Sequence, residues 1–463
     1  MNASLFYAMT PILVLSGTAM ALMIQASIKR DHKVASIIVA IGLILSLLGS
    51  YYASNYTQPV TVLLQVDNWS LFFTGLIIAA SLIILSLSLK TFLPEGERKE
   101  EYYLLLILSV LGAVVLIQSS HMVSLLLGME LMGVALYVMI AFPERGDLPL
   151  EGAIKYLVLS ACASAMLLYG FALIYAATGS LSYIGIGAEV ARAYEQNPVL
   201  VLAGSAMVLA GIGFKLSVAP FHMWTPDVYE GAPTSITSYF AVVPKVAGLA
   251  LLIKFMLIPF SNILSEWQTI MIFISIASMI LGAVAAIVQT NIKRLLAYSS
   301  IGHIGYALAG VATGSISGYE SAVLYISIYV VMNIGAFSCL YLMKKDGVYK
   351  ENISDLSGIS KKNPVLAISF LIILFSLAGI PPLAGFFAKF YIFTSVIEQK
   401  MYALAIIGLL TTVISAFYYL KIIKTIYFDD SLITFDIVKN KVAKATIFVS
   451  CSVLITFFLY PSL

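Results

Sequence analysis

The sequence predicts an all-α polytopic membrane protein that crosses the bilayer about fourteen times. Three observations predict this fold: 61% of the 463 residues are hydrophobic, only 11% are charged, and apolar runs recur along the chain. A soluble globular chain has about 45–50% apolar and about 25% charged residues. A water-soluble fold could not bury this much apolar side chain. The net charge of +3 gives no basic field, so we expect the lipid bilayer and no nucleic acid as a partner.

Each span is predicted from its length, because a transmembrane helix needs about 20 predominantly apolar residues. The runs that meet this length are 7–27, 34–54, 70–90, 102–119, 121–141, 152–178, 198–219, 233–258, 268–289, 293–313, 320–343, 364–396, 401–424 and 442–460. The longest stretch between them, near 344–363, has about 20 residues. We therefore expect no extramembrane domain that binds a nucleotide or a flavin.

Lysine and arginine are distributed unequally between the two ends of these spans. Nineteen lie in odd-numbered connections, and only Arg192 and Lys400 lie in even-numbered ones. Cytoplasmic loops of membrane proteins carry an excess of Lys and Arg. The pattern predicts that both termini lie on the outer side of the membrane.

Ionisable side chains inside the spans are the candidate functional residues. Five lysines fall there, Lys155, Lys215, Lys245, Lys254 and Lys389, and Glu130 lies inside the span 121–141. A charge at the bilayer centre costs about 2.5–3.5 kcal/mol on insertion scales, and such residues usually mark an ion path. Lys254 and Lys155 are near span ends, where a long side chain can instead reach the interface.

These residue types are suited to proton transfer. The protonation state of lysine responds to burial and to nearby charge, whereas arginine stays protonated. A Glu130–Lys215 pair that forms and breaks would switch Lys215 between its protonated and neutral forms. His222 and His303 are either further relay groups or ordinary polar contacts. The three cysteines are far apart, so we expect no metal site or iron–sulfur cluster in this chain.

Two of the spans are interrupted by proline. Pro220 and Pro226 follow the span 198–219, and Pro381 and Pro382 lie within the span 364–396. Broken helices at matching places in two halves indicate a transport site. The two spans are five helices apart, which predicts inverted five-helix repeats of spans 4–8 and 9–13. The expected segments are an N-terminal three-helix segment (1–101), the two repeats (102–258 and 259–424) and a C-terminal helix (425–463).

Four ordered motifs resemble the antiporter-like subunits of respiratory complex I and their Mrp-antiporter relatives. They read GFKLSVAPFHMWTPDVYEGAPTSIT, FAVVPKVAGLALL, IKRLLAYSSIGHIGYALAG and SLAGIPPLAGFFAKFYIF. The resemblance covers spans 4–13. It implies the same fold of fourteen core helices with broken helices 7 and 12.

Within this family the chain is most similar to subunit N of NADH:quinone oxidoreductase, because helix 12 carries Lys389 and the chain stops after span 14. The resemblance implies a Glu130–Lys215 pair, a central Lys245, an exit residue Lys389 and the helix-6 lysine Lys155. It also implies that flavin, iron–sulfur clusters and quinone bind other subunits. The implied partners are a small K-like subunit and an antiporter-like M-like subunit in the bacterial inner membrane.

The resulting hypothesis is a proton-translocating subunit of a redox complex that performs no redox chemistry itself. The main alternative is a subunit of a Mrp-type cation/proton antiporter or of a membrane-bound hydrogenase. Two further hypotheses are a structural scaffold and a self-contained solute carrier. No substrate pocket is indicated beyond the charged residues.

Overall fold

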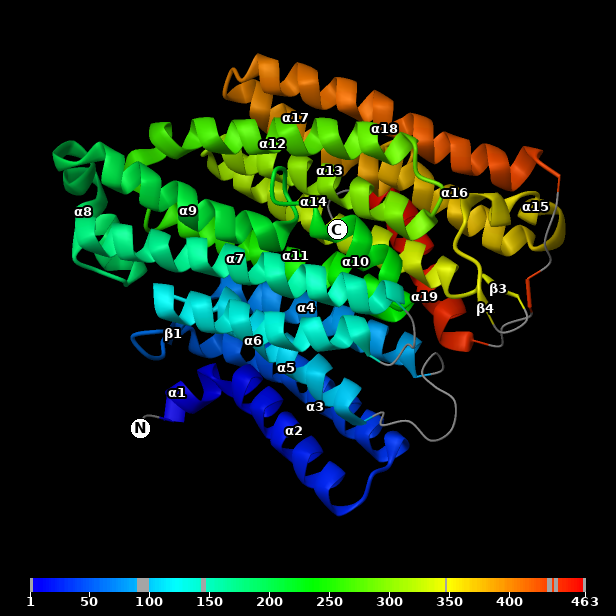
Figure 1. The fold of residues 1–463 in the computed structure, drawn as a ribbon, viewed down its shortest axis with the longest axis horizontal. Helices are drawn as coiled ribbons and strands as arrows, with labels where there is room; N and C mark the ends of the chain where they lie inside the picture. The colour runs from blue at the N-terminus through cyan, green and yellow to red at the C-terminus, as the bar shows by residue number, and fades with distance from the viewer. Residues whose placement is uncertain are drawn as a thin grey trace. The chain divides into compact units, whose positions relative to one another are not determined.

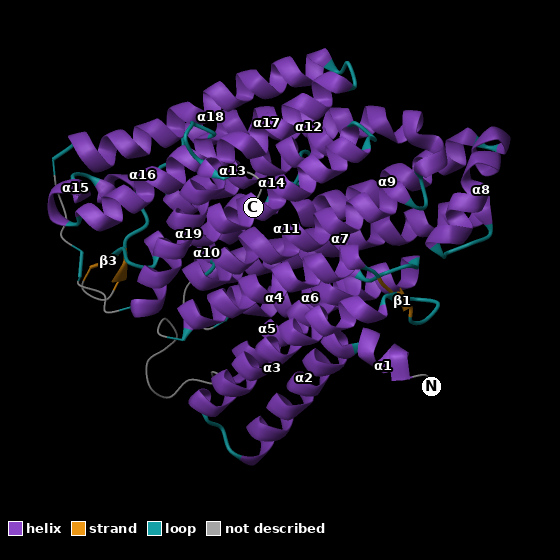
Figure 2. Ribbon diagram, turned by 180° about the vertical axis from the view of Figure 1, so that it is seen from behind, coloured by secondary structure: helices purple, strands orange, loops and turns teal. Residues whose placement is uncertain are grey.

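The computed structural model describes residues 3–89, 100–142, 147–345, 348–430, 435–436 and 440–460. Nearly all of this part of the chain is helical (Figure 2). Thirteen of its helices are long and apolar enough to cross a membrane. The remaining predicted span is split into two helices of 15 residues each, α16 (Pro364–Ala378) and α17 (Ala384–Glu398). The predicted fold class is therefore confirmed.

One compact unit consists of Met1–Leu216 and Gly231–Trp267. Its helices are α1 (Ala3–Ala8), α2 (Thr10–Ile28), α3 (His32–Ala53), α4 (Asn68–Ser88), α5 (Glu100–Ile117), α6 (Met122–Ala141), α7 (Asp147–Thr178), α8 (Tyr183–Gln196), α9 (Pro198–Leu216) and α11 (Thr234–Leu257) (Figure 1). A hairpin of β1 (Gln58–Pro59) and β2 (Gln65–Val66) precedes α4. Helix α11 is almost completely buried, so it forms the centre of this unit.

The other compact unit consists of Ser217–Glu230 and Gln268–Leu463. It contains α10 (Trp224–Gly231), most of α12 (Leu264–Ile287), α13 (Ile292–Ala312), α14 (Ile316–Leu340), α15 (Ile359–Lys362), α16, α17, α18 (Tyr402–Phe428) and α19 (Lys441–Leu459). A second hairpin pairs β3 (Lys344–Lys345) with β4 (Val348–Tyr349). Helices α13 and α14 are the most completely buried membrane-length helices of this unit.

Glycine allows the first two helices of each predicted repeat to cross closely. A Cβ on Gly112 in α5 would lie 2.4 Å from the backbone N of Met132 in α6. A Cβ on Gly282 in α12 would lie 2.5 Å from the backbone N of Gly302 in α13. Both distances are far below van der Waals contact, so any side chain would push the helices apart.

The second helix of each crossing, α6 or α13, begins in the same way. A β-bridge joins His121 to Ser182, and the His121 ring caps α6. A β-bridge joins Asn291 to Asn352, and the Asn291 side chain caps α13. These matched features support two repeats of the same local design. The segment bounds expected from the sequence stay predictions.

The two helix breaks lie beside Pro220 and beside Pro381 and Pro382, as predicted, but the prediction for Pro226 was wrong. Helix α9 ends at Leu216, and Ser217 has a left-handed backbone with φ +62°. The Ala219–Pro220 and Pro381–Pro382 peptide bonds are cis. Pro226, expected in a polar link, lies instead in the first turn of α10. A first-turn proline is tolerated because its missing N–H would have no partner in the helix.

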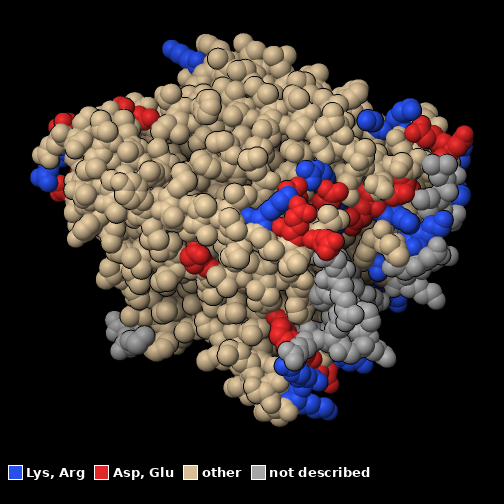
Figure 3. All heavy atoms as spheres, in the orientation of Figure 1, with Lys and Arg blue, Asp and Glu red and all other residues tan. Residues whose placement is uncertain are grey.

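Much of the molecular surface is uncharged. Figure 3 shows one face on which most side chains are neither acidic nor basic. Many large apolar residues are exposed on α2, α3, α7 and α18, as expected for helices that contact lipid or other subunits. Five of the cationic residues that predicted the orientation, Lys90, Arg98, Lys99, Arg145 and Lys439, lie outside the described residues.

Candidate functional site

In the first unit, two serines of α7 bind Glu130 and Lys215, one serine to each. Glu130 lies on α6 and accepts a short hydrogen bond from the Ser164 hydroxyl. Lys215 lies at the end of α9, and its Nζ donates to Ser160 Oγ at 3.1 Å. Ser160 and Ser164 are four residues apart, so they share one face of α7. Glu130 and Lys215 form no direct ion pair in the described part of the chain, and hydroxyl groups lie along the route between them.

The surroundings of Lys215 are mainly aromatic. Its Nζ lies 5.3 Å from the ring centroid of Tyr156 and 5.9 Å from those of Tyr137 and Phe214. Aromatic faces attract cations within about 6 Å. The Tyr156 hydroxyl is 3.5 Å from the same Nζ, and the Tyr137 hydroxyl donates to Ser160 at 2.6 Å. Lys215 is only 2% exposed, so these groups replace most of its hydration.

Lys245 lies in the middle of α11 and is completely buried. It follows Pro244, the one proline inside this helix. A proline inside a helix removes one backbone hydrogen bond and frees a carbonyl oxygen for another donor. The amine of Lys245 therefore lies in the most deeply buried helix of the first unit.

In the second unit, Lys389 lies beside the break between α16 and α17. Its Nζ donates to the carbonyl oxygens of Ala378 at 2.9 Å and Leu377 at 3.3 Å, at the end of α16. Carbonyl groups at a helix C-terminus lack helical partners and carry partial negative charge, which favours a cation. Gly379 ends α16 with φ +82°, and a Cβ there would lie 2.8 Å from the Lys389 side chain. The ring centroid of Tyr306 is 4.9 Å from Nζ.

His303 lies in a buried network of hydroxyl groups in the second unit. Its Nδ1 is 2.6 Å from the Tyr325 hydroxyl, and its Nε2 is 3.1 Å from the Tyr419 hydroxyl. Tyr419 also forms a short hydrogen bond with Ser299. The network links α13, α14 and α18, so both nitrogens of the imidazole ring are held in place.

Two other predicted residues lie in less enclosed positions. Lys155 is paired with Glu151 one turn earlier on α7 at 2.6 Å, and its side chain is 41% exposed. His222 lies in the break after α9 and is partly buried, and its carbonyl oxygen accepts from the Thr225 N–H. Among the hydrogen bonds of the described residues, neither side chain is a partner of Lys215 or Lys389.

The sequence reasoning missed four ion pairs at the ends of helices. Arg294 Nη1 binds Asp227 at 2.7 Å and Glu230 at 2.9 Å, which attaches α10 to the start of α13. Lys293 binds Glu351 at 2.8 Å. Lys254 was expected to reach the interface, but its side chain is 4% exposed and pairs with Asp67 at 3.3 Å. Aspartate before a predicted span is a frequent helix cap, which was the available signal for Asp67.

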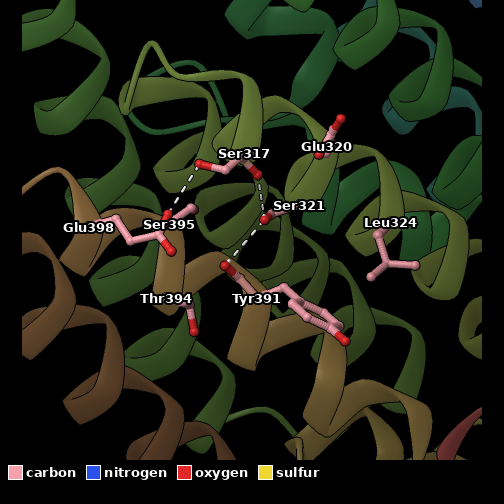
Figure 4. Close-up of a pocket in the computed structure, with 8 residues that line it drawn as sticks. All are labelled: Ser317, Glu320, Ser321, Leu324, Tyr391, Thr394, Ser395 and Glu398. Carbon is pink, nitrogen blue, oxygen red and sulfur yellow. Dashed lines mark hydrogen bonds between the residues drawn. The ribbon is translucent and has the colours of Figure 1, made fainter. Parts of the chain in front are cut away.

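A cavity of about 370 Å³ lies between the start of α14 and the end of α17 (Figure 4). Its lining residues are Ser317, Glu320, Ser321, Leu324, Tyr391, Thr394, Ser395 and Glu398. Ser317 donates to Glu398 at 3.3 Å, and Ser321 donates to the Tyr391 carbonyl at 3.2 Å. Within the described residues, no group of three or more His, Cys, Asp or Glu side chains is arranged to hold a metal ion.

Comparison with known proteins supports the resemblance seen in the four motifs. A family model described as NADH:quinone oxidoreductase/Mrp antiporter, TM, matches residues 119–415. The chain belongs to this family. The region that the family model matches contains Glu130, Lys215, Lys245 and Lys389.

Two relatives and one solved structure are similar to this chain over most of its length. NADH-quinone oxidoreductase subunit N of Pelagibacter ubique is 50% identical over 397 residues, covering 86% of this chain and 83% of the relative. Subunit N of Parvibaculum lavamentivorans is 42% identical over 98% of this chain and 94% of its own length. A chain of respiratory complex I from Thermus thermophilus has a TM-score of 0.84 at 29% identity, with 98% of each chain covered.

Proposed function

We propose that this chain is the proton-translocating subunit N of an NADH:quinone oxidoreductase. The observation that carries the proposal is the position of Lys215 and Lys389. Each lysine is at least 95% buried beside a helix break, and neither forms an ion pair with a carboxylate within the described residues. Buried ionisable residues inside a membrane are expensive and are retained for function. The relatives named subunit N, matched over most of the chain, support assignment to this complex.

The proton moves along the buried residues in the proposed order Glu130, Lys215, Lys245 and Lys389. Ser164 and Ser160 provide hydroxyl groups between the first two members. Hydroxyl groups both donate and accept hydrogen bonds, so they can pass a proton without holding a charge. The carbonyl groups that hold Lys389 at the α16 terminus stabilise its protonated form until the proton leaves.

The energy for this transfer comes from a change of charge in a neighbouring subunit. Moving one charge against 100 mV costs about 2.3 kcal/mol. Forming or breaking one charge contact at about 4 Å is worth about 4 kcal/mol at an effective dielectric of about 20. The energy of one such change near Glu130 therefore exceeds the cost of moving one proton against 100 mV.

The finer assignments belong to the same proposal. The chain performs no redox catalysis, and the flavin, iron–sulfur clusters and quinone bind to other subunits. Its membrane neighbours are a K-like and an M-like subunit. The chain lies in a bacterial inner membrane with both termini outside, which the distribution of Lys and Arg supports. The alternative, a subunit of a Mrp-type antiporter or a membrane-bound hydrogenase, predicts different co-purifying chains in mass spectrometry of the intact complex.

The test uses Lys215→Ala and Glu130→Ala in the assembled complex. Both variants should lose most coupled quinone-reductase activity and most proton pumping, because the first transfer is removed. Lys361→Ala is the matched control, since this lysine is 64% exposed and pairs only loosely with Asp430 at 3.6 Å. Full pumping in both Lys215→Ala and Glu130→Ala would overturn the proposal.

A further inference from the structure

Two serines on the central helix of the first unit have hydroxyl groups with no hydrogen-bond partner in the part of the chain that the structure describes. Ser235 and Ser238 of α11 are both 0% exposed, and neither Oγ has a partner among the described residues. A buried polar group without a partner is rare, because it has lost its water and gained nothing in return. These two hydroxyls therefore require an explanation.

Other hydroxyls in the same region are satisfied by their own helix. Thr237, between the two serines, donates to the carbonyl oxygens of Ala232 and Pro233 at 3.2 Å. Ser205 on α9 is similarly buried and donates to the Val201 carbonyl at 2.7 Å. This bond to a carbonyl one turn earlier is the usual solution for serine and threonine in a helix. Ser238 forms no such bond within the described residues, so its hydroxyl remains available to another partner.

Ser238 and Lys245 lie on the same face of α11. They are seven residues apart, which is close to two full turns and about 10 Å along the axis. Side chains in a helix lean toward its N-terminus, so Lys245 extends back toward Ser238. Ser235 lies about one turn before Ser238. The lysine side chain spans only part of this distance, so a proton that travels between the two residues needs an intermediate carrier.

Helix α4, which packs against α11, carries a second pair of such hydroxyls. Thr74 and Ser81 are both 0% exposed; Thr74 has no partner among the described residues, and Ser81 lies close to the hydroxyl of Tyr239 on α11. They are also seven residues apart, so they share one face of α4. Buried polar groups without protein partners are usually satisfied by ordered internal water.

We propose that Ser238, together with Ser235, holds internal water that delivers the proton to Lys245. This inference rests on the proposed function and adds two residues and a direction of approach, from the N-terminal end of α11. Each serine hydroxyl accepts a hydrogen bond from one water molecule and donates to the next. As the proton passes, each serine oxygen takes a proton from the preceding water and releases its own hydroxyl proton to the next water, so one O–H bond forms as another breaks and the serine ends unchanged.

The decisive comparison is Ser238→Thr against Ser238→Val in the assembled complex. Threonine and valine have the same shape, so any packing disturbance is shared and only the hydroxyl differs. Ser238→Thr should keep at least about half of the coupled proton pumping. Ser238→Val should lose about fivefold or more, with a larger slowing in D2O than the wild-type chain shows. Equal pumping and equal isotope effects in the two variants would overturn the inference.

Control variants separate this inference from the proposed function. Ser205→Thr and Ser205→Val should pump equally, because the hydroxyl there is bound to its own helix. Lys245→Ala should lose pumping, and a normal rate in that variant would overturn the proposed function itself. If both Ser238 variants fail to assemble, Ser238→Ala replaces them. It should then lose about twofold, and full pumping with an unchanged isotope effect would count against the inference.

Discussion

The buried pair of Lys254 and Asp67 allows a quantitative prediction about a lysine that we assign no role in proton transfer. The two side chains are 3.3 Å apart, with 4% and 29% of their surfaces exposed. Their direct attraction is about 5 kcal/mol at an effective dielectric of about 20. Desolvation offsets most of this, so the pair contributes little net stability, but removing one partner of a buried pair costs about 3–5 kcal/mol. The two single variants should therefore behave differently from the double variant.

Asp67→Asn should be the more harmful change, because it leaves the nearly inaccessible ammonium of Lys254 without a counter-charge. Asparagine still caps α4, so the cap is not lost with the charge. We expect a cost of about 3 kcal/mol, at the low end of the range since Asp67 is partly exposed. Lys254→Met should cost about 1 kcal/mol, because Asp67 can reach water and still accepts the Ser70 N–H at 2.7 Å.

Amide hydrogen exchange at the start of α4 measures this difference in the intact complex. Each 1.4 kcal/mol corresponds to about a tenfold change in local opening, so Asp67→Asn should accelerate exchange by about a hundredfold and Lys254→Met by about fivefold. The double variant should return to within about threefold of the original chain. If the effects of the two changes simply add, or if Lys254→Met is the more damaging, the reasoning about burial is wrong.

Two further predictions concern the ends and crossings of helices. Arg294→Gln should remove the guanidinium that Asp227 and Glu230 share and speed amide exchange in α10 about tenfold, because a charge-assisted hydrogen bond at a one-third exposed site is worth about 1.5 kcal/mol. Unchanged exchange would show that this contact does not hold α10. Gly112→Val should prevent assembly of the complex, measured by native gel electrophoresis, since its Cβ would approach the Met132 backbone at 2.4 Å. Gly17→Val, with nothing within 4 Å of the corresponding position, should assemble normally, and equal assembly of both variants would contradict the close crossing.

The spans could be predicted from the sequence because length and apolar composition determine them. Helix α12 was expected at 268–289 and lies at Leu264–Ile287, and α18 was expected at 401–424 and lies at Tyr402–Phe428. The breaks were also predictable, since proline cannot continue a helix without losing a hydrogen bond. Helices α8 and α10 were missed because they are short and polar enough to read as connections, although Pro226 followed by Asp227 is typical of a helix start.

The hydroxyl groups near the lysines could not be predicted from the sequence. In spans that are apolar on every side, the sequence does not indicate which face of a helix meets which neighbour. Ser160 and Ser164 therefore could not be distinguished from the many other serines of the spans before the structure placed them between Glu130 and Lys215. The pairing of Lys254 with Asp67 joins positions far apart in the chain, and no local pattern predicts such a contact.

The most direct test of the account is the number of protons pumped per electron by the reconstituted complex that carries Lys389→Met. Methionine keeps the length and apolar stem of the side chain but removes the amine that binds the Ala378 and Leu377 carbonyl groups. We expect a clear loss of pumped protons per electron, or a loss of coupled turnover of about fivefold or more. An unchanged proton ratio at an unchanged rate would contradict the claim that the buried lysines carry the proton.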